Sequence, residues 1–472
     1  MSGTKKLNWG LILSLALWCF ITLIRAFNHS PWYDEAHAWL VSQELNLIEL
    51  VKVLRIEGHT FLWYLCLMPF AKSNFMYPYS MLLLNWLFCF AAMLILWLKA
   101  PFNNWIKFLI SFSFPFLALY PVVARCYSIG IMLLFAITAM EKKKLEHPNW
   151  YALLLILCAN TSLMAMVGAT VFGILFIIAL IKNGKKLLFP FLIMILGAII
   201  VIFQLPFNIS HNALISTLNL APLSIWFFKS TFFNNCLYFN VFFLVILSML
   251  VLLFYLKNKI FPIFLFVSYI MLFSIFSIYS GGIWHHFFFY IYFIISSWLI
   301  YEKYEFKNIK WNFLLIFVIA FVSFCFIFWK PDIKERKEVW NSKTAKSAEM
   351  ILADKSLLNS NIFVFETQKS IFPIYFRGKK INVINYCAQN TIQWDVSSYY
   401  SSDACRFDGQ DNAIVILKDD YIKKFYTDNS YLLTSNKVKS PDGSFTAGLK
   451  NYKFIFYKDL DQNYLWKVEK IK

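Results

Sequence analysis

Residues 31–39, Pro-Trp-Tyr-Asp-Glu-Ala-His-Ala-Trp, and residues 55–64, Arg-Ile-Glu-Gly-His-Thr-Phe-Leu-Trp-Tyr, are the charged part of an otherwise apolar half of the chain. Asp34 is the only aspartate before Asp332, and five of the nine carboxylates in residues 1–330 lie between positions 34 and 57. Carboxylates beside long apolar segments are costly unless they are solvated, paired or functional. This cluster, which also holds two histidines, is therefore either a solvated loop or a functional site.

The composition predicts the fold class. Of the 472 residues, 60% are hydrophobic, 20% are aromatic and only 15% are charged, and apolar runs of about 20 residues recur, the length that crosses a bilayer as a helix. We expect an all-α polytopic membrane protein with about eleven transmembrane helices. The expected spans are residues 9–27, 77–98, 105–121, 126–140, 149–164, 165–181, 187–206, 236–256, 260–279, 286–301 and 311–329.

The net charge of +18 does not indicate a nucleic-acid partner, because the lysines lie in short clusters between the apolar runs. That distribution is typical of the cytoplasmic loops of membrane proteins. Met1–Lys6 and the following apolar run resemble a signal peptide, but no small-residue cleavage site follows the run. We therefore expect an uncleaved first helix with its N-terminus inside.

The apolar run 61–71 sets the topology. At 1.5 Å per residue its eleven residues cover about 17 Å of a bilayer core of about 30 Å, so we expect it to lie along the outer interface. Fifteen basic residues of the first 330 then lie inside and seven outside. If the run crossed the membrane, Lys142, Lys143 and Lys144 would face outward, against the positive-inside bias.

This topology gathers the candidate residues on the outer face. The outer face is expected to carry the first outer loop, residues 28–76, together with Arg125, Tyr127, the loop 207–235 and residues 281–286. A single interfacial histidine is more often structural than functional, but six of the seven histidines lie on this face. They are His29, His37, His59, His211, His285 and His286.

The composition changes near Pro331, because 39 of the 70 charged residues lie in the last 142 residues. We expect residues 331–472 to form a small soluble α/β domain outside the membrane, following a transmembrane domain of residues 1–330. Its expected strands are 361–365, 381–384 and 413–417, and its expected helices are 344–355 and 419–425. It has no phosphate-binding loop, so a docking or acceptor-presenting role is expected. Among nine cysteines, Cys387 and Cys405 are the two able to form a disulfide.

The outer-face residues predict a type of chemistry. Nucleotide sugars and ATP are cytosolic, and the chain has no Walker or glycine-rich nucleotide motif, so group transfer outside needs an activated donor carried by a lipid. Such a transfer requires a carboxylate that accepts the acceptor's proton and a cation that stabilises the departing phosphate. Asp34 and Arg125 are residues of these two types.

These residues also carry a family resemblance. Asp34-Glu35 after the first apolar run, Glu57-Gly58-His59 before an aromatic interfacial run, and residues 121–128, Pro-Val-Val-Ala-Arg-Cys-Tyr-Ser, together resemble the GT-C superfamily of membrane glycosyltransferases. The similarity is to its protein-mannosyltransferase-like, aminoarabinose-transferase-like branch, glycosyltransferase family 39. It covers residues 1–330.

The resemblance implies a role for each candidate. Asp34 corresponds to the catalytic base, with Glu35 as its neighbour. Glu57 corresponds to an acidic residue that holds the acceptor or a divalent metal, and His59 belongs to the same motif. Thr60 stands where relatives usually have proline. The other implied substrate-binding residues are Arg125, which corresponds to an arginine on the donor phosphate, Tyr127, His285 and His286.

Three alternatives to a transferase remain open. A transporter or lipid flippase would place ionisable residues at mid-membrane in repeated halves, whereas the charges here lie in loops. A structural subunit would have no reason to gather carboxylates and histidines on one face. A glycosidase could use Asp34 and Glu57 as acid and base, but a water-using enzyme gains little from eleven spans.

The sequence thus predicts a multi-pass protein of the bacterial inner membrane that transfers a sugar from a polyprenyl-phosphate donor to a lipid, glycan or protein acceptor outside. Membrane lipids are its other expected partners. A divalent metal is a possible cofactor, with Glu57 and His59 as its candidate ligands.

Overall fold

The structure is a computed structural model. It describes residues 9–31, 33–57, 59–184, 186, 188–204, 260–278, 283–304, 316, 319–320, 344–364, 372, 374–376, 379–385, 390–391, 419–434, 443–446, 449–460 and 463–471. The expected span 236–256, most of the span 311–329, the loop 207–235, the strand 413–417, Cys387 and Cys405 lie outside these residues.

The chain folds into two compact units. The first comprises Met1–Asn28, Leu45–Phe70 and Phe75–Pro331, and the second comprises His29–Glu44, Ala71–Asn74 and Asp332–Lys472. The segment 29–44 from the expected outer loop is thus grouped with the C-terminal residues.

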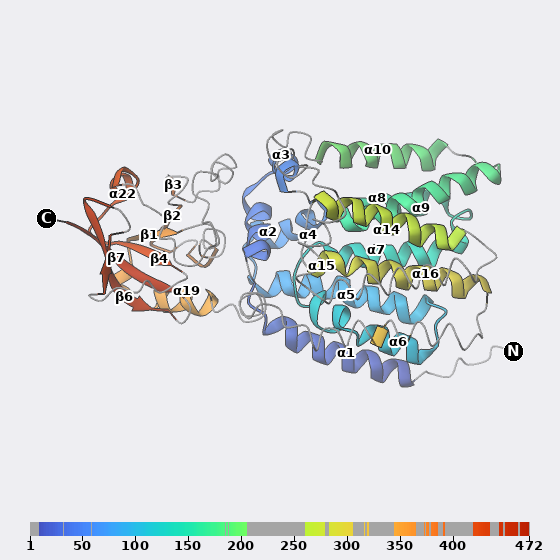
Figure 1. The fold of residues 1–472 in the computed structure, drawn as a ribbon, viewed down its shortest axis with the longest axis horizontal. Helices are drawn as coiled ribbons and strands as arrows, with labels where there is room; N and C mark the ends of the chain where they lie inside the picture. The colour runs from blue at the N-terminus through green and yellow to red at the C-terminus, as the bar shows by residue number, and fades with distance from the viewer. Residues whose placement is uncertain are drawn as a thin grey trace. The chain divides into compact units, whose positions relative to one another are not determined.

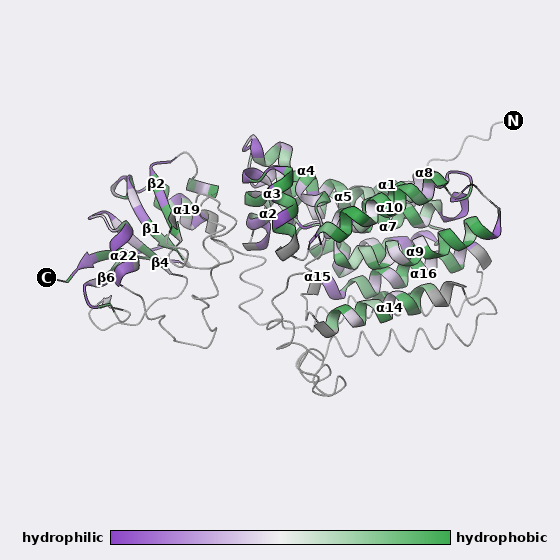
Figure 2. Cartoon of the chain, turned by 90° about the horizontal axis from the view of Figure 1, so that it is seen from above, coloured by the Kyte–Doolittle hydropathy of each residue, from purple (hydrophilic) through white to green (hydrophobic). Residues whose placement is uncertain are grey.

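The described part of the chain is mostly helical, with a small C-terminal β-sheet (Figure 1). The α-helices of residues 9–304 are α1 (Trp9–Phe27), α2 (Tyr33–Glu44), α3 (Leu47–Glu57), α4 (Leu62–Lys72), α5 (Tyr79–Lys99), α6 (Asn104–Ser111), α7 (Tyr127–Met140), α8 (Pro148–Ala159), α9 (Leu163–Lys182), α10 (Leu188–Gln204), α14 (Ile260–Ile278), α15 (Ile283–His286) and α16 (Phe288–Tyr304). In the first unit, α5, α7, α9, α14 and α16 run alongside one another, and Figure 2 shows that apolar residues cover most of their length.

In the described part of the chain, two helices, α5 and α9, are long and apolar enough to cross a membrane. Shorter apolar helices lie at Ile12–Phe27, Pro148–Ala159, Leu188–Gln204 and Phe264–Phe276. The expectation of about eleven spans therefore goes beyond what the described helices show. One reason is length: α7 has 14 residues, or about 21 Å at 1.5 Å per residue.

The expected span 105–121 is not one helix. Helix α6 ends at Ser111, and a π-helical turn follows at Pro115–Leu119. Pro115 has no N–H to donate to the helix ladder. The Ser111 and Ser113 hydroxyls also donate to backbone carbonyls of α6, a local hydrogen bond that bends helices.

Close helix packing in the first unit depends on Gly168 of α9. Its N–H donates to the Tyr292 hydroxyl of α16 at 2.8 Å, and that hydroxyl donates in turn to the Met164 carbonyl. A Cβ at position 168 would lie 2.7 Å from the Tyr292 ring and 2.8 Å from Leu134 of α7. The glycine therefore lets α7, α9 and α16 approach one another.

The second unit contains a seven-stranded mixed sheet in the order β3-β2-β1-β4-β7-β6-β5. Its strands are β1 (Ser360–Val364), β2 (Ile381–Asn385), β3 (Asn390–Thr391), β4 (Ser430–Thr434), β5 (Ser444–Phe445), β6 (Tyr452–Asp459) and β7 (Tyr464–Lys470). Strand β1 pairs in parallel with β2 and β4, and the other pairings are antiparallel.

Both faces of this sheet are buried, since successive residues of a strand point to opposite faces. Ile362 lies in one apolar cluster with Ile351 of α19 (Thr344–Leu352). Phe363 lies in another cluster with Ile422 of α22 (Asp419–Phe425). An α/β layer arrangement results, with one helix packed on each face.

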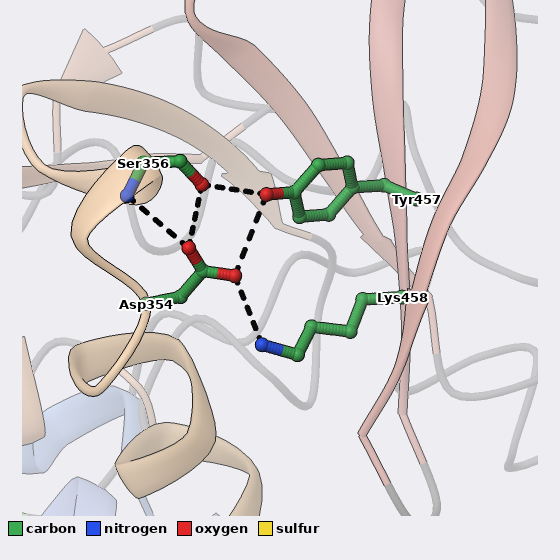
Figure 3. A network of polar contacts seen from close by, with 4 residues as sticks. All are labelled: Asp354, Ser356, Tyr457 and Lys458. Carbon is green, nitrogen blue, oxygen red and sulfur yellow. Dashed lines mark hydrogen bonds and ion pairs between the residues drawn. The ribbon is translucent and has the colours of Figure 1, made fainter.

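Asp354 ties the end of α19 to β6 (Figure 3). Its carboxylate accepts hydrogen bonds from the Ser356 N–H at 3.1 Å and from Lys458 Nζ at 2.9 Å. The Tyr457 hydroxyl reaches it at 3.4 Å. Tyr457 and Lys458 are chain neighbours, and a register shift between Phe456 and Lys458 marks a bulge at which both can face one carboxylate.

The first prediction concerns Gly168→Ala. Alanine gains about 1 kcal/mol of helix propensity, but overpacking costs about 1–3 kcal/mol, and the contacted Tyr292 is held by two hydrogen bonds. We expect a lower melting temperature for the full-length protein in detergent. Gly173→Ala is the matched control on the same helix, because a Cβ at position 173 would meet only the flexible end of the Met194 side chain at 3.1 Å. If the Gly168→Ala protein were as stable as this control, the close packing of Gly168 against Tyr292 would be contradicted.

The second prediction concerns Asp354. Hydrogen bonds from Ser356 and Lys458 lower the pKa of its carboxyl from 3.8 to about 2. A carboxyl with a lowered folded-state pKa stabilises the fold above its unfolded pKa, and the contribution disappears as pH falls from about 4 toward 2. Asp354→Asn keeps an oxygen that accepts from the Ser356 N–H but loses the charge that attracts Lys458. It should therefore cost about 0.2–1 kcal/mol near neutral pH, the usual contribution of a partly exposed ion pair, measured as faster hydrogen exchange in β6 of the full-length protein. The difference from wild type should shrink below pH 4, and a difference independent of pH would contradict the assignment.

Candidate active site

Arg125 lies in the turn between the π-helix 115–119 and α7. The backbone N–H of Arg125 donates to the Val123 carbonyl. The Tyr120 carbonyl accepts two hydrogen bonds, one from the Ser128 hydroxyl and one from the side-chain amide of Asn85 in α5, both at 2.8 Å. These bonds satisfy backbone groups that the broken helix leaves without helical partners. The turn is thereby fixed, and the Arg125 side chain is only 7% exposed.

His59 precedes α4, whose first turn is anchored by two buried amides. The Phe61 N–H donates to the Gln204 side chain at the end of α10 at 2.8 Å, and the Leu62 N–H donates to the Asn160 carbonyl at 3.0 Å. The Gln204 amide also donates to the Asn160 side chain at 3.1 Å. The ends of α8 and α10 thus set the position of the segment that carries His59.

Arg125 and His59 are in direct contact, with 2.7 Å between Nη2 and Nε2. A guanidinium has only donors, so Nε2 of His59 accepts, and the neutral imidazole carries its proton on Nδ1. The Cys126 sulfur lies 3.9 Å from Nδ1, within reach of that proton. One histidine thus contacts two successive residues of the turn.

Tyr127 and His285 extend this group of residues. The Tyr127 hydroxyl lies 2.6 Å from His285 Nε2, and the two rings meet edge to face at 5.2 Å. The short helix α15, which carries His285, is held a second time by the Tyr120 hydroxyl, which donates to the Trp284 carbonyl at 2.9 Å. Helix α15 is therefore fixed to the turn that carries Arg125.

We call these residues the arginine–histidine cluster: His59, Arg125, Cys126, Tyr127 and His285. The Tyr127 ring is near the other members of the cluster. The His59 ring meets the Tyr127 ring edge to face at 6.3 Å, and the guanidinium carbon of Arg125 lies 6.0 Å from the centre of the Tyr127 ring. A nearly buried guanidinium bordered by imidazole and hydroxyl groups provides charge-assisted donors for an anion such as phosphate.

Four of the substrate-binding residues expected from sequence, His59, Arg125, Tyr127 and His285, therefore come together. The ring of His286, the next residue of α15, stacks on Phe276 of α14 at 4.4 Å. Glu57 ends α3, and its side chain lies outside the described residues.

The described residues contain no group of three or more histidine, cysteine, aspartate or glutamate side chains placed to hold a metal ion, and they do not include the Glu57 side chain. Nε2 of His59 contacts a guanidinium, which a metal cation would have to displace.

Asp34 and Glu35 of the first loop lie in the second unit, at the start of α2. Asp34 is half-buried, whereas Glu35 and His37 are buried at 0% and 4% exposure. Glu35 contacts His29, with 2.7 Å between Oε2 and Nε2. The two catalytic candidates therefore differ: the Asp34 carboxylate is partly accessible, and the Glu35 carboxylate is not.

Sequence reasoning did not single out Tyr120, Asn160 or Gln204, which support the cluster. Gln204 is the only strongly polar side chain of α10, and Asn160 follows the apolar helix α8. An amide in an apolar run must find a partner, so the signal was present, but the partner could not be read from the sequence.

Comparison of the chain with protein-family models, with curated proteins and with solved structures gives no match.

The third prediction concerns Tyr127→Phe. It removes the hydroxyl that contacts His285, and a buried polar group that loses its partner costs about 1–3 kcal/mol. We expect a lower melting temperature in detergent. Tyr79→Phe is the matched control, since Tyr79 is 48% exposed; equal melting temperatures for the two variants would contradict the tyrosine–histidine contact.

Proposed function

We propose that this protein is a membrane glycosyltransferase that transfers a sugar from a polyprenyl-phosphate donor to an acceptor outside the membrane. Asp34 acts as the general base on the acceptor. Arg125, with His59 beside it, binds the donor phosphate, and Tyr127 and His285 hold the turn on which Arg125 lies.

The observation that carries the proposal is the arginine–histidine cluster. Its members come from three segments, at residues 59, 125–127 and 285, and four of them, His59, Arg125, Tyr127 and His285, are substrate-binding residues expected from the sequence. A buried guanidinium is costly in an apolar helical unit. The cost of burying the Arg125 guanidinium beside a neutral imidazole and a tyrosine hydroxyl is accounted for if the guanidinium binds an anionic headgroup.

The proposed reaction balances without a further reactant. The Asp34 carboxylate accepts the proton of an acceptor hydroxyl, whose oxygen forms a bond to the anomeric carbon of the sugar. The bond from that carbon to the phosphate oxygen breaks, and polyprenyl phosphate leaves with the electron pair. The Arg125 guanidinium stabilises the charge that develops on that oxygen.

The proposal includes the topology expected from sequence. About eleven spans carry the lipid-facing half, with the N-terminus and the lysine clusters inside and the first loop and C-terminal domain outside. The lysine cluster 142–144 supports this orientation, because it directly follows α7, whose opposite end begins beside Arg125.

The fourth prediction tests this topology. A cysteine at position 143 should resist an impermeant maleimide in intact cells, and one at position 57 should react, in a background without native cysteines. Labelling at 143 and not at 57 would reverse the orientation and exclude an outward-facing reaction.

The fifth prediction tests the chemistry. Deleting the gene should remove a sugar from the envelope glycans, measured by mass spectrometry, and the wild-type gene should restore it. Asp34→Asn should lower the restoration rate about 100-fold to 10,000-fold, the usual cost of losing a general base, while binding of undecaprenyl phosphate to the purified protein stays unchanged. Arg125→Ala should lower the restoration rate and also weaken the binding of undecaprenyl phosphate, because a cation next to a phosphate stabilises both the ground state and the transition state.

Two variants serve as controls in the same assays. Glu44→Gln changes an exposed carboxylate at the far end of α2, and Arg25→Ala changes an exposed arginine of α1; both should behave as wild type. Restoration at the wild-type rate by Asp34→Asn would remove the base assignment. Unchanged envelope glycans after deletion would refute the glycosyltransferase itself.

A further inference from the structure

His29 and Glu35 form a buried polar pair next to the proposed base. His29 lies between α1 and α2, and Glu35 lies in the first turn of α2, six residues later. His29 Nε2 and Glu35 Oε2 are 2.7 Å apart, and the two side chains are 1% and 0% exposed. The contact joins the segment before Pro31, which is also buried, to the first turn of α2.

The burial of Glu35 separates its role from that of Asp34. Successive residues of a helix point about 100° apart, so when Glu35 points into the protein, Asp34 cannot point the same way, and it is half-buried. A carboxylate without solvent exposure gives an acceptor hydroxyl no approach, whereas Asp34 keeps an accessible side.

The imidazole of His29 is held chiefly through this contact. Its other nitrogen, Nδ1, is buried and has no hydrogen-bond partner among the described residues. A buried carboxylate needs hydrogen-bond partners to stay buried. Removing either member of the pair therefore takes this contact from the other and loosens the first turn of α2.

We propose that His29 and Glu35 are a positioning pair: their contact fixes the first turn of α2 and thereby orients Asp34 as the base. This inference rests on the proposed function, in which Asp34 is the general base. It assigns neither proton transfer nor substrate contact to Glu35, which the sequence had grouped with Asp34 as catalytic.

A direct readout is the accessibility of position 34. Asp34→Cys in the full-length protein is treated with a maleimide, and mass spectrometry quantifies the labelled peptide over time. Adding His29→Ala or Glu35→Ala should change the labelling rate at position 34 several-fold, and adding Glu44→Gln should not. Labelling rates unaffected by His29→Ala and Glu35→Ala would overturn the proposal, whatever reaction the protein performs.

The second readout is activity per folded molecule in the glycan restoration assay. We expect His29→Ala and Glu35→Ala each to lower the rate about 10-fold to 100-fold, a usual effect of misplacing a reacting group. The double variant should be no worse than either single variant, since both remove one contact. Undecaprenyl phosphate binding should stay unchanged.

Glu35→Gln keeps the fold testable if the alanine variants do not fold. Glutamine has nearly the same shape and retains an oxygen that accepts from the imidazole N–H, but it cannot serve as a base. Activity within a few-fold of wild type for Glu35→Gln supports positioning. Loss of activity in Glu35→Gln with wild-type activity in Asp34→Asn would instead make Glu35 the base and overturn the pair's role, while leaving the glycosyltransferase standing.

Discussion

The contact between Arg125 and His59 depends on a constraint that acts throughout the helical unit: a charged group buried among apolar side chains must have hydrogen-bond partners that are fixed in place. Arg125 is 7% exposed and lies in a turn where a helix has been interrupted. The interruption leaves backbone groups to be satisfied, and the Asn85 amide and the Ser128 hydroxyl both donate to the Tyr120 carbonyl. The polar groups that hold the turn are thus a consequence of the interruption, and they fix the backbone that carries the cation.

The residues proposed to take part in the chemistry lie in different surroundings. The first unit offers the Arg125 cation, which contacts His59 before α4 and lies near Tyr127 of α7, and Tyr127 in turn contacts His285 of α15. The second offers a partly accessible carboxylate at the start of α2, next to a carboxylate that is buried against a histidine. Neighbouring acidic residues with such different surroundings suit different tasks, since accessibility is needed for proton transfer and burial is suited to support.

The sequence predicted most of the described helices because their signals are local, but it predicted only β1 and β2 among the seven described strands. Apolar runs and short β-branched strands gave α1, α5, α7, α9, β1 and β2 within a few residues, and α22 with both of its bounds. The interruption before Pro115 was missed, although proline and two serines signalled it. The side-chain pairings could not be predicted, because Tyr127 meets His285 across 158 positions and Gln204 meets the Phe61 amide across 143, and no local pattern encodes such contacts. The bulge that turns both Tyr457 and Lys458 toward Asp354 was equally invisible, since it depends on strand pairing.

The central claim is that Arg125 binds a lipid-linked phosphate, and the most direct measurement is an electron cryomicroscopy structure of the full-length protein in lipid nanodiscs saturated with undecaprenyl phosphate. The account predicts density for the phosphate within hydrogen-bond distance of the Arg125 guanidinium, with the His59 contact replaced or shared. Phosphate density at another position, with the contact between Arg125 Nη2 and His59 Nε2 still at 2.7 Å, would contradict it.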